Sequence, residues 1–379
     1  MWVQDFGSSV PCCCNLVAIP CFVIFTFCDL YFVICDFHRF VFRSSFISTL
    51  MLGLALTGTL HSATGGKRGT AGAQELLVPV GGRATALGGS AAADVAGAEA
   101  LFWNPAGIVR TARPFEALFF HQTHLYDIAN IAAGATVSFG EAGTVGLLVR
   151  SLQVGAIPVT TVDRPYGTGD TYTPSFVTYG IAYGRRFTDM ISLGVTVKLV
   201  TERVLEASAV GLAFDAGLQY RTGVEGLEIG FVIQNIGDDM RFDGESLNEP
   251  NTLYPNRTVI APFPLPTTIQ IGATYDLRFD DAGRLRLMGK VQSNSFDTDQ
   301  YIAALEYSFA DRLFLRGSAD LHGDVRRDAF GADMFTYPYA AGAGVRLTPA
   351  DGIEASFDYA FRYSRTFTGS HSFGLTVAL

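Results

Sequence analysis

The strongest constraint on this chain is an alternation of apolar and polar residues with a period of two, repeated along most of its length. In residues 191–199 the odd positions hold Ile, Leu, Val, Val and Leu, and the even positions hold Ser, Gly, Thr and Lys. Successive side chains of a β-strand point to opposite faces, so this pattern indicates strands with one apolar and one polar face. It predicts about fourteen strands, near residues 115–124, 128–139, 143–154, 175–187, 190–203, 207–221, 226–236, 266–278, 283–294, 299–309, 312–321, 338–348, 352–363 and 370–379.

Two architectures hide one face of such strands, a soluble β-sandwich and a membrane barrel. Most of the segments have nine or more residues, which is the length that a tilted strand needs to cross a bilayer, and an even count suits a bacterial barrel. The charged positions share their face with Gly, Ser and Thr, as in a polar lumen. We therefore expect an all-β fold, a transmembrane antiparallel β-barrel of about 14 strands over residues 113–379, with lumen-facing polar residues that include Lys198, Asp215, Asp276, Arg316, Asp320, Glu354, Asp358 and Arg362.

Composition excludes several kinds of partner and activity. The net charge of −9 and the absence of a basic run argue against a nucleic-acid partner. All six cysteines lie between residues 12 and 35, so a mature chain without them cannot form a wrong disulfide in an oxidising periplasm. The sequence contains no nucleophile elbow, P-loop or His-Glu-x-x-His motif, and we predict neither an enzyme nor a bound cofactor.

No candidate metal site has a convincing spacing. His121 and His124 are three residues apart on a predicted strand, so their side chains would point to opposite faces. The acidic run at 238–245 matches no EF-hand and is better explained as a solvated loop. It belongs to one of three long connections, about 155–174, 237–265 and 322–337, which we expect on the extracellular side.

The N-terminal region has the composition of a targeting segment. Residues 41–73 hold basic residues, an apolar run at 46–60 and then small residues, and we interpret them as a signal peptide with its cleavage region. Cleavage would fall after Ala63 or after the triplet Ala71-Gly72-Ala73. Residues 1–40 are a doubtful extension that we expect to be untranslated; the alternative is an inner-membrane anchor in the apolar run at 11–35.

Residues 74–112 are rich in Gly and Ala and cannot form a core by themselves. A barrel of about fourteen strands is wider than one whose interior the wall side chains fill, so we expect this segment to be a plug in the lumen. The pattern predicts a helix from Ala91 to Leu101, with Ser90 as its N-cap. Pro105 disfavours helix at Asn104, where the helix should stop. The inward charges would then form Arg–Asp and Arg–Glu pairs that clamp the plug, or alternatively a substrate path.

The plug region also carries a family resemblance. The pattern Gly-Gly-Arg-Ala-x-Ala-Leu-Gly-Gly, followed by Ala-Leu-Phe-Trp-Asn-Pro-Ala-Gly, resembles the N-terminal signature of the PorV/PorQ family, relatives of the FadL-type outer-membrane barrels. The stretches 231–237 and 264–272 agree with it. The resemblance covers residue 75 to the C-terminus, and its signature residues are Gly81, Gly82, Arg83, Gly88, Gly89, Trp103, Asn104, Pro105 and Gly107.

The resemblance implies a bacterial outer-membrane protein in contact with lipid, and two functions. The first is association with type IX protein secretion, with secreted cargo proteins or components of the secretion machinery as partners. The alternative is FadL-like uptake of hydrophobic small molecules through the lumen or a lateral gap as the plug shifts. The motif match is nearest to the secretion-associated family, which favours the first function at this stage.

Overall fold

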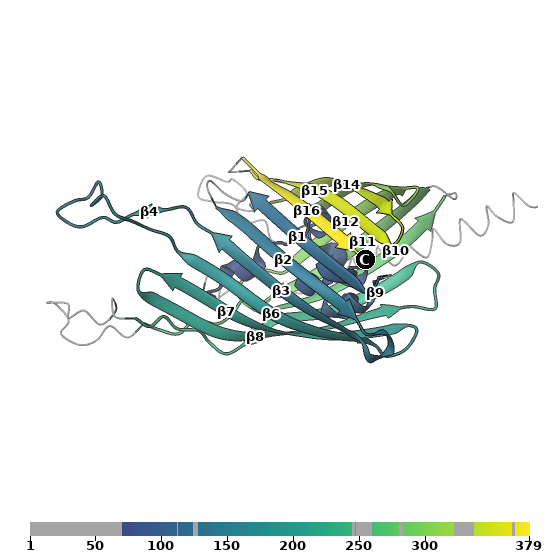
Figure 1. Cartoon of the computed structure of the whole chain (residues 1–379), viewed down its shortest axis with the longest axis horizontal. Helices are drawn as coiled ribbons and strands as arrows, with labels where there is room; N and C mark the ends of the chain where they lie inside the picture. Colours follow the sequence, from purple (N-terminus) through teal and green to yellow (C-terminus); the bar gives the residue numbers. More distant parts are fainter. Residues whose placement is uncertain are drawn as a thin grey trace, which may run out of the picture. The chain divides into compact units, whose positions relative to one another are not determined.

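A computed structural model describes residues 70–111, 113–123, 128–244, 247, 260–279, 283–321, 337–365 and 368–379. Within these residues, fourteen antiparallel strands close into one barrel (Figure 1). Each strand pairs with its neighbours in sequence, and the first strand pairs with the last to close the sheet. The strands are β1 (Phe115–Thr123), β2 (Ala129–Ser138), β3 (Thr144–Gln153), β6 (Ser175–Arg186), β7 (Ile191–Val204), β8 (Ala207–Arg221), β9 (Leu227–Gly237), β10 (Thr268–Arg278), β11 (Gly283–Asn294), β12 (Gln300–Phe309), β13 (Leu313–Asp320), β14 (Tyr339–Ala350), β15 (Ile353–Tyr363) and β16 (Ser370–Ala378).

The barrel confirms the predicted fold class and strand positions, with each strand beginning and ending within two residues of its expected limits. The period-two pattern succeeded because every strand has one face toward the lumen and one face outward. The sequence did not reveal two short strands, β4 (Ile157–Pro158) and β5 (Thr171–Tyr172), which pair in the connection between β3 and β6 and project beyond the barrel (Figure 1).

The outward face of the barrel is apolar. Ile181 and Leu315 are 62% and 63% exposed in the middle of their strands, and many other aliphatic side chains share that face. Exposed phenylalanines stand where strands meet short turns, at Phe139, Phe187, Phe279 and Phe309. An apolar band with an aromatic rim is the surface of a protein embedded in lipid. The chain is a bacterial outer-membrane barrel.

The two ends of the barrel differ in their connections. Strand β1 begins and β16 ends at the end that carries the short turns, whereas residues 154–174, 238–267 and 321–338 all connect strands at the opposite end. In barrels of this type the short turns are periplasmic and the long loops extracellular. We name these the turn end and the loop end. All three long connections therefore lie on one side, as expected.

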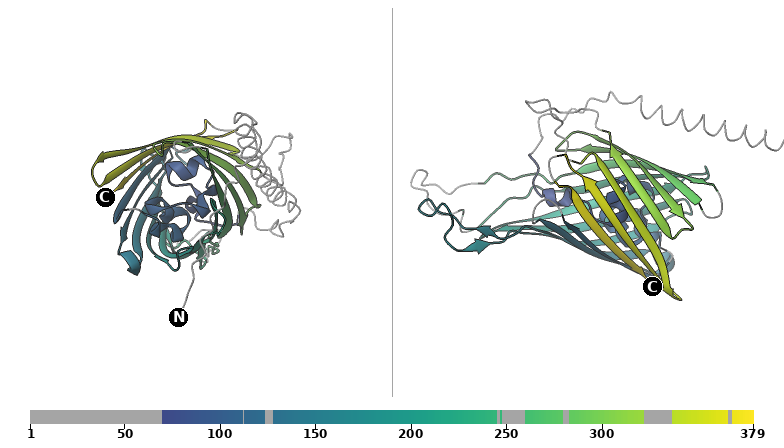
Figure 2. Two further views of the ribbon diagram at one scale, coloured as in Figure 1. Left: turned by 90° about the vertical axis from the view of Figure 1, so that its right-hand side faces the viewer. Right: turned by 90° about the horizontal axis from the view of Figure 1, so that it is seen from above.

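Residues 70–111, named here the inner segment, lie inside the barrel (Figure 2). They form only short pieces of helix. Among all the described residues, no helix combines the length and the apolar character that a membrane span needs. The apolar run at 11–35 lies outside the described residues. The pieces are η1 (Gln74–Leu77), α2 (Gly82–Ala86), η2 (Ser90–Ala93), η3 (Gly97–Glu99), α3 (Ala100–Trp103) and η4 (Pro105–Val109).

The predicted helix from Ala91 to Leu101 is wrong. Gly97 has a φ of +61°, a left-handed conformation that interrupts a right-handed helix, and the residue before it is extended. Ser90 is not an N-cap, because its hydroxyl donates to the carbonyl of Leu87. The expected stop was right: α3 ends at Trp103, and Asn104 is extended.

The inner segment touches the wall through backbone as well as side chains. A Cβ added to Gly194 of β7 would lie 2.2 Å from the carbonyl carbon of Pro105, and one added to Gly230 of β9 would lie 2.3 Å from the carbonyl oxygen of Ala92. Only a glycine permits such a close approach at these two places. Gly342 in β14 is similarly close to the inner segment, since its Cβ would lie 2.5 Å from the Cβ of Ala86.

Candidate functional site

Arg83, in helix α2, connects the inner segment to the wall of the barrel. Its Nη2 donates to Asp94 Oδ2 at 2.6 Å, and its Nε donates to Glu306 Oε2 at 2.9 Å. Asp94 follows η2 in the inner segment, whereas Glu306 belongs to β12 and is separated from Arg83 by 223 residues. The side chains of Asp94 and Glu306 are 1% and 4% exposed. The guanidinium is therefore shared between two buried carboxylates.

Two wall arginines complete this network. Arg286 of β11 donates to Asp94 Oδ2 at 2.6 Å and pairs with Asp276 of β10. Arg316 of β13 donates to Glu306 Oε2 at 2.6 Å and to Asp358 of β15 at 2.5 Å. Five strands of the wall, β10 to β13 and β15, are thus linked to the inner segment through charge-assisted hydrogen bonds, which are stronger than neutral ones. We name this set the arginine network.

Glu99 binds helix α2 within the inner segment. Its Oε1 accepts the backbone N–H of Ala84 at 3.0 Å. Burial raises the pKa of Glu99 to about 7, although Arg83 and Arg316 nearby and the bond to Ala84 favour the charged form; Asp358 disfavours it. Near neutral pH this carboxyl therefore changes charge while it accepts the N–H of Ala84.

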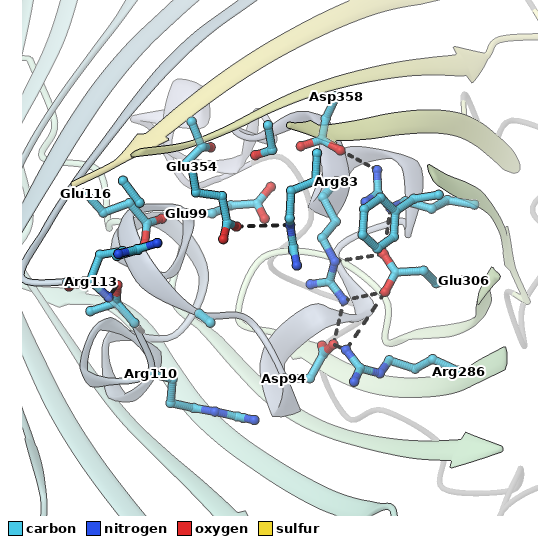
Figure 3. Close-up of a pocket in the computed structure, with 18 of the residues that line it drawn as sticks. Arg83, Asp94, Glu99, Arg110, Arg113, Glu116, Arg286, Glu306, Glu354 and Asp358 are labelled. Carbon is cyan, nitrogen blue, oxygen red and sulfur yellow. Dashed lines mark hydrogen bonds and ion pairs between the residues drawn. The ribbon is translucent and has the colours of Figure 1, made fainter. Parts of the chain in front are cut away.

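Below the inner segment lies a cavity of about 330 Å³, named the turn-end cavity (Figure 3). Its polar wall consists of seven arginines and six acidic residues, with few apolar contacts. Arg110 belongs to it and makes a two-pronged pair with Glu228 of β9, at 2.7 and 2.9 Å. Such a wall binds water and ions and opposes a hydrocarbon, because an apolar solute would desolvate the charges without replacing their hydrogen bonds.

At the opposite end, Arg150 of β3 holds the start of the inner segment. Its guanidinium donates to the carbonyls of Leu76 at 3.1 Å and Val78 at 2.7 Å, and to the carbonyl of Glu75. Ala73 is 2% exposed and packs with Val200 of β7 in an apolar cluster. These contacts fix residues 71–78 against the loop-end half of the wall.

A smaller cavity of about 60 Å³, named the loop-end cavity, lies between this part of the inner segment and β9–β11. One side is apolar and includes Val80, Phe102 and Trp103. The other side carries neutral amides, among them Gln234 and Gln270. The lumen therefore offers a small site of apolar, amide and guanidinium groups beside the start of the inner segment, and a charged cavity at the turn end.

Several signature residues hold the inner segment together. Trp103 Nε1 donates to the carbonyl of Val80 at 2.7 Å. A Cβ on Gly89 would lie 2.4 Å from the Trp103 ring, and Gly81 has a φ of +94°. The remaining signature glycines are equally crowded, with a Cβ meeting Asp358 at Gly82, Ile302 and Ser318 at Gly88, and the Val95 carbonyl at Gly107.

Asn104, like Arg83, reaches the wall. Its Nδ2 donates to the carbonyl of Ala92 at 2.7 Å and to that of Leu218 in β8 at 3.2 Å, while its Oδ1 accepts the N–H of Ala106. Pro105 follows as the first residue of η4, where its missing N–H costs nothing. The Asn-Pro pair is a cap that also ties η4 to β8.

The eight predicted lumen-facing polar residues do not form one site. Asp276, Arg316 and Asp358 belong to the arginine network. Glu354 lines the turn-end cavity and pairs with Arg346 at 3.1 Å. Lys198, Asp215, Asp320 and Arg362 lie elsewhere, with Arg362 over the ring of Tyr337 at 4.2 Å.

Lys198 and Asp215 meet at a break in the sheet. Their charged groups lie 2.8 Å apart, and Asp215 also accepts the N–H of Asn235 at 2.8 Å. Asn235 has a φ of +59°, and the pairing of β8 with β9 shifts register between Phe214 and Ala216. Asn235 belongs to the stretch 231–237 that carries part of the family resemblance, so that stretch forms a β-bulge closed by an ion pair.

Sequence reasoning missed Arg286, Glu306, Arg150 and Gln270. Arg286 and Glu306 each stand between two apolar residues of a strand, and this isolated inward charge was the available signal. Among the residues that the structure describes, no group of three or more His, Cys, Asp or Glu could hold a metal. His121 lies on the exposed face of β1, and His124 is outside the described residues.

Comparison with solved structures finds the same architecture. The deltaS2S3 mutant of the monoaromatic hydrocarbon channel TodX has a TM-score of 0.50 and 10% identity, with 78% of this chain and 97% of that chain covered. The monoaromatic hydrocarbon channel CymD has a TM-score of 0.49 and 12% identity, with 79% and 97% covered. A Pseudomonas aeruginosa FadL homologue has a TM-score of 0.48 and 11% identity, with the same coverage of 79% and 97%.

These identities limit the likeness to the fold. No protein-family model and no curated protein matches the sequence.

Proposed function

We propose that this protein is an outer-membrane channel for the uptake of small hydrophobic molecules. The observation that carries the proposal is the fold shared with the mutant of the monoaromatic hydrocarbon channel TodX, together with the inner segment that occupies the lumen. The loop-end cavity adds support, because apolar side chains of the inner segment line it. The shared fold and the loop-end cavity favour uptake, whereas the sequence alone favoured secretion.

The turn-end cavity restricts the route. A hydrophobic solute that moved straight down the lumen would enter a space lined by thirteen charged side chains, which desolvation makes unfavourable. The solute therefore leaves the lumen above this cavity, or passes only after the inner segment has moved. In both cases the inner segment controls the passage.

A reversible cross-link tests this control. A Cβ on Gly272 of β10 would lie 3.2 Å from the Cβ of Ala92, a few tenths of an ångström below the usual spacing in a disulfide. The described chain contains no cysteine, so the double variant Ala92→Cys/Gly272→Cys can form only the intended bond within it. We expect oxidised cells to take up labelled toluene slowly and reduced cells to recover the wild-type rate.

The two single-cysteine variants are the controls, and a mobility shift on a non-reducing gel establishes that the bond has formed. Unchanged uptake in the oxidised double variant would contradict control by the inner segment. Equal toluene uptake with and without the gene would contradict the uptake function itself.

Association with type IX secretion is the second candidate, and the resemblance of Gly81–Gly107 to the PorV/PorQ signature is the observation that favours it. A strain that lacks the gene separates the two functions. Cargo proteins retained in the periplasm would support secretion, whereas normal secretion with slow uptake of hydrophobic compounds would support the channel.

A further inference from the structure

We infer that Glu75 and Glu202 share a single proton, and that this proton fastens the start of the inner segment to the wall of the barrel. Glu75 belongs to η1 of the inner segment, and Glu202 lies near the loop end of β7. A shared proton makes the closed lumen sensitive to pH whatever solute the channel carries, and so goes beyond the proposed uptake function.

The two carboxyl groups meet in a place that water hardly reaches. Glu75 is 5% exposed and Glu202 is 6% exposed. The Glu202 carboxyl lies within hydrogen-bonding reach of the Glu75 carboxyl and of the N–H of Ala73, the residue before η1. Glu75 Oε1 is buried, and no donor of the described residues bonds to it. Two ionised carboxylates offer only acceptors to each other, whereas one proton between them makes a hydrogen bond.

The charged groups around this pair do not balance it. Arg150 of β3 directs its guanidinium to three backbone carbonyls of the inner segment, and Lys198 of β7 pairs with Asp215 of β8 at 2.8 Å. All three residues are buried. Together with Glu75 and Glu202, they would hold three negative and two positive charges when fully ionised. Burial opposes the excess negative charge, and one bound proton removes it.

The proton affinity of Glu75 agrees with this charge balance. Its pKa is raised to about 7, first by burial and then by the neighbouring Glu202, against the opposing effects of a backbone hydrogen bond and of Arg150. The docked segment therefore keeps a proton that the released segment, with the ordinary value of 4.5, gives up. The contribution to docking is complete below that ordinary value and is lost as the pH rises through about 7.

Amide hydrogen exchange of residues 74–80 measures this contact directly. The full chain is purified from outer membranes in detergent, and exchange is followed by mass spectrometry from pH 5 to pH 9. Each rate is divided by the intrinsic rate of the unfolded peptide. We expect protection of residues 74–80 to fall by about 50-fold between pH 5 and pH 8 and then to stay constant, because the docked state alone binds the proton below pH 7. The barrel strands should remain protected throughout.

Glu75→Gln supplies the donor permanently, because its amide N–H can donate to Glu202 at every pH. We expect the protection of this variant at pH 8 to equal that of the wild type at pH 5. Glu202→Gln should act in the same way with the donor on the other side, so either variant alone is sufficient. Heat-modifiable migration establishes that each variant folds.

Glu206→Gln is the matched control. Glu206 is an exposed glutamate in the turn between β7 and β8, at the same end of the barrel as Glu202. This variant should keep the wild-type pH dependence of exchange in residues 74–80.

Equal protection of residues 74–80 at pH 5 and pH 8 in the unaltered chain would overturn the inference, and this result requires no variant. A wild-type pH dependence that persists in Glu75→Gln and Glu202→Gln, or one that Glu206→Gln removes, would also overturn it. Toluene uptake by cells tests the channel separately. A chain that shows the pH dependence and takes up no toluene keeps the shared proton and loses the channel function.

Discussion

Replacing Arg83 by glutamine is the most direct test of how the lumen is closed. The change removes one guanidinium that Asp94 and Glu306 share, and both carboxylates stay buried. Loss of one partner from a buried ion pair costs about 3–5 kcal/mol. Asp94 keeps Arg286 and Glu306 keeps Arg316, so we expect a loss of about 3 kcal/mol, at the lower end of that range.

This loss acts on the contact between the inner segment and the wall, because Arg83 is the arginine that the inner segment contributes to the network. A change of about 3 kcal/mol raises the ratio of released to docked inner segment by about 100-fold. Conductance in planar bilayers should show more frequent open events. Amide hydrogen exchange of residues 84–100 should accelerate, while exchange in the barrel strands remains slow.

Arg346→Gln is the control. Arg346 also lines the turn-end cavity, but its partner Glu354 is on the neighbouring wall strand, and the two side chains are 42% and 35% exposed. Such a pair contributes about 1 kcal/mol or less. Conductance and exchange in Arg83→Gln that equal those of the wild type, or of Arg346→Gln, would refute the role given to the arginine network.

Three further outcomes are expected. The raised pKa of Glu99 means that its contribution to docking is complete below its ordinary value near 4.5 and is lost as the pH rises through about 7, so open events should increase over that range. Glu99→Gln should weaken the dependence without removing it, because burial also raises the pKa of Glu75 in the same segment to about 7. Gly230→Ala should lower the free energy of unfolding by about 1–3 kcal/mol, because the added methyl group meets backbone, whereas Gly289→Ala, with nothing within 4 Å, should have no effect in the same denaturant titration. N-terminal sequencing of the exported protein should find a start before Ala73, because Ala73 is buried in the fold, and a chain that begins after Ala73 would contradict this.

The sequence was sufficient for the barrel wall. Alternate residues of a strand that lies between lipid and lumen face one environment or the other, so the pattern is visible within a short stretch of sequence. Turn residues separate one strand from the next. The Gly- and Ala-rich stretch likewise predicted a segment without a core of its own. Pro105 located the end of its last α-helix for a local steric reason.

The interior depended on contacts between distant residues. The helix expected from Ala91 to Leu101 breaks at Gly97, and the pairing of Arg83 with Glu306 joins residues 223 positions apart, which no local period encodes. The alternation of residue types shows whether a side chain faces lipid or the lumen. Which lumen side chains meet depends on how the barrel closes, so only the tertiary structure could identify these pairs.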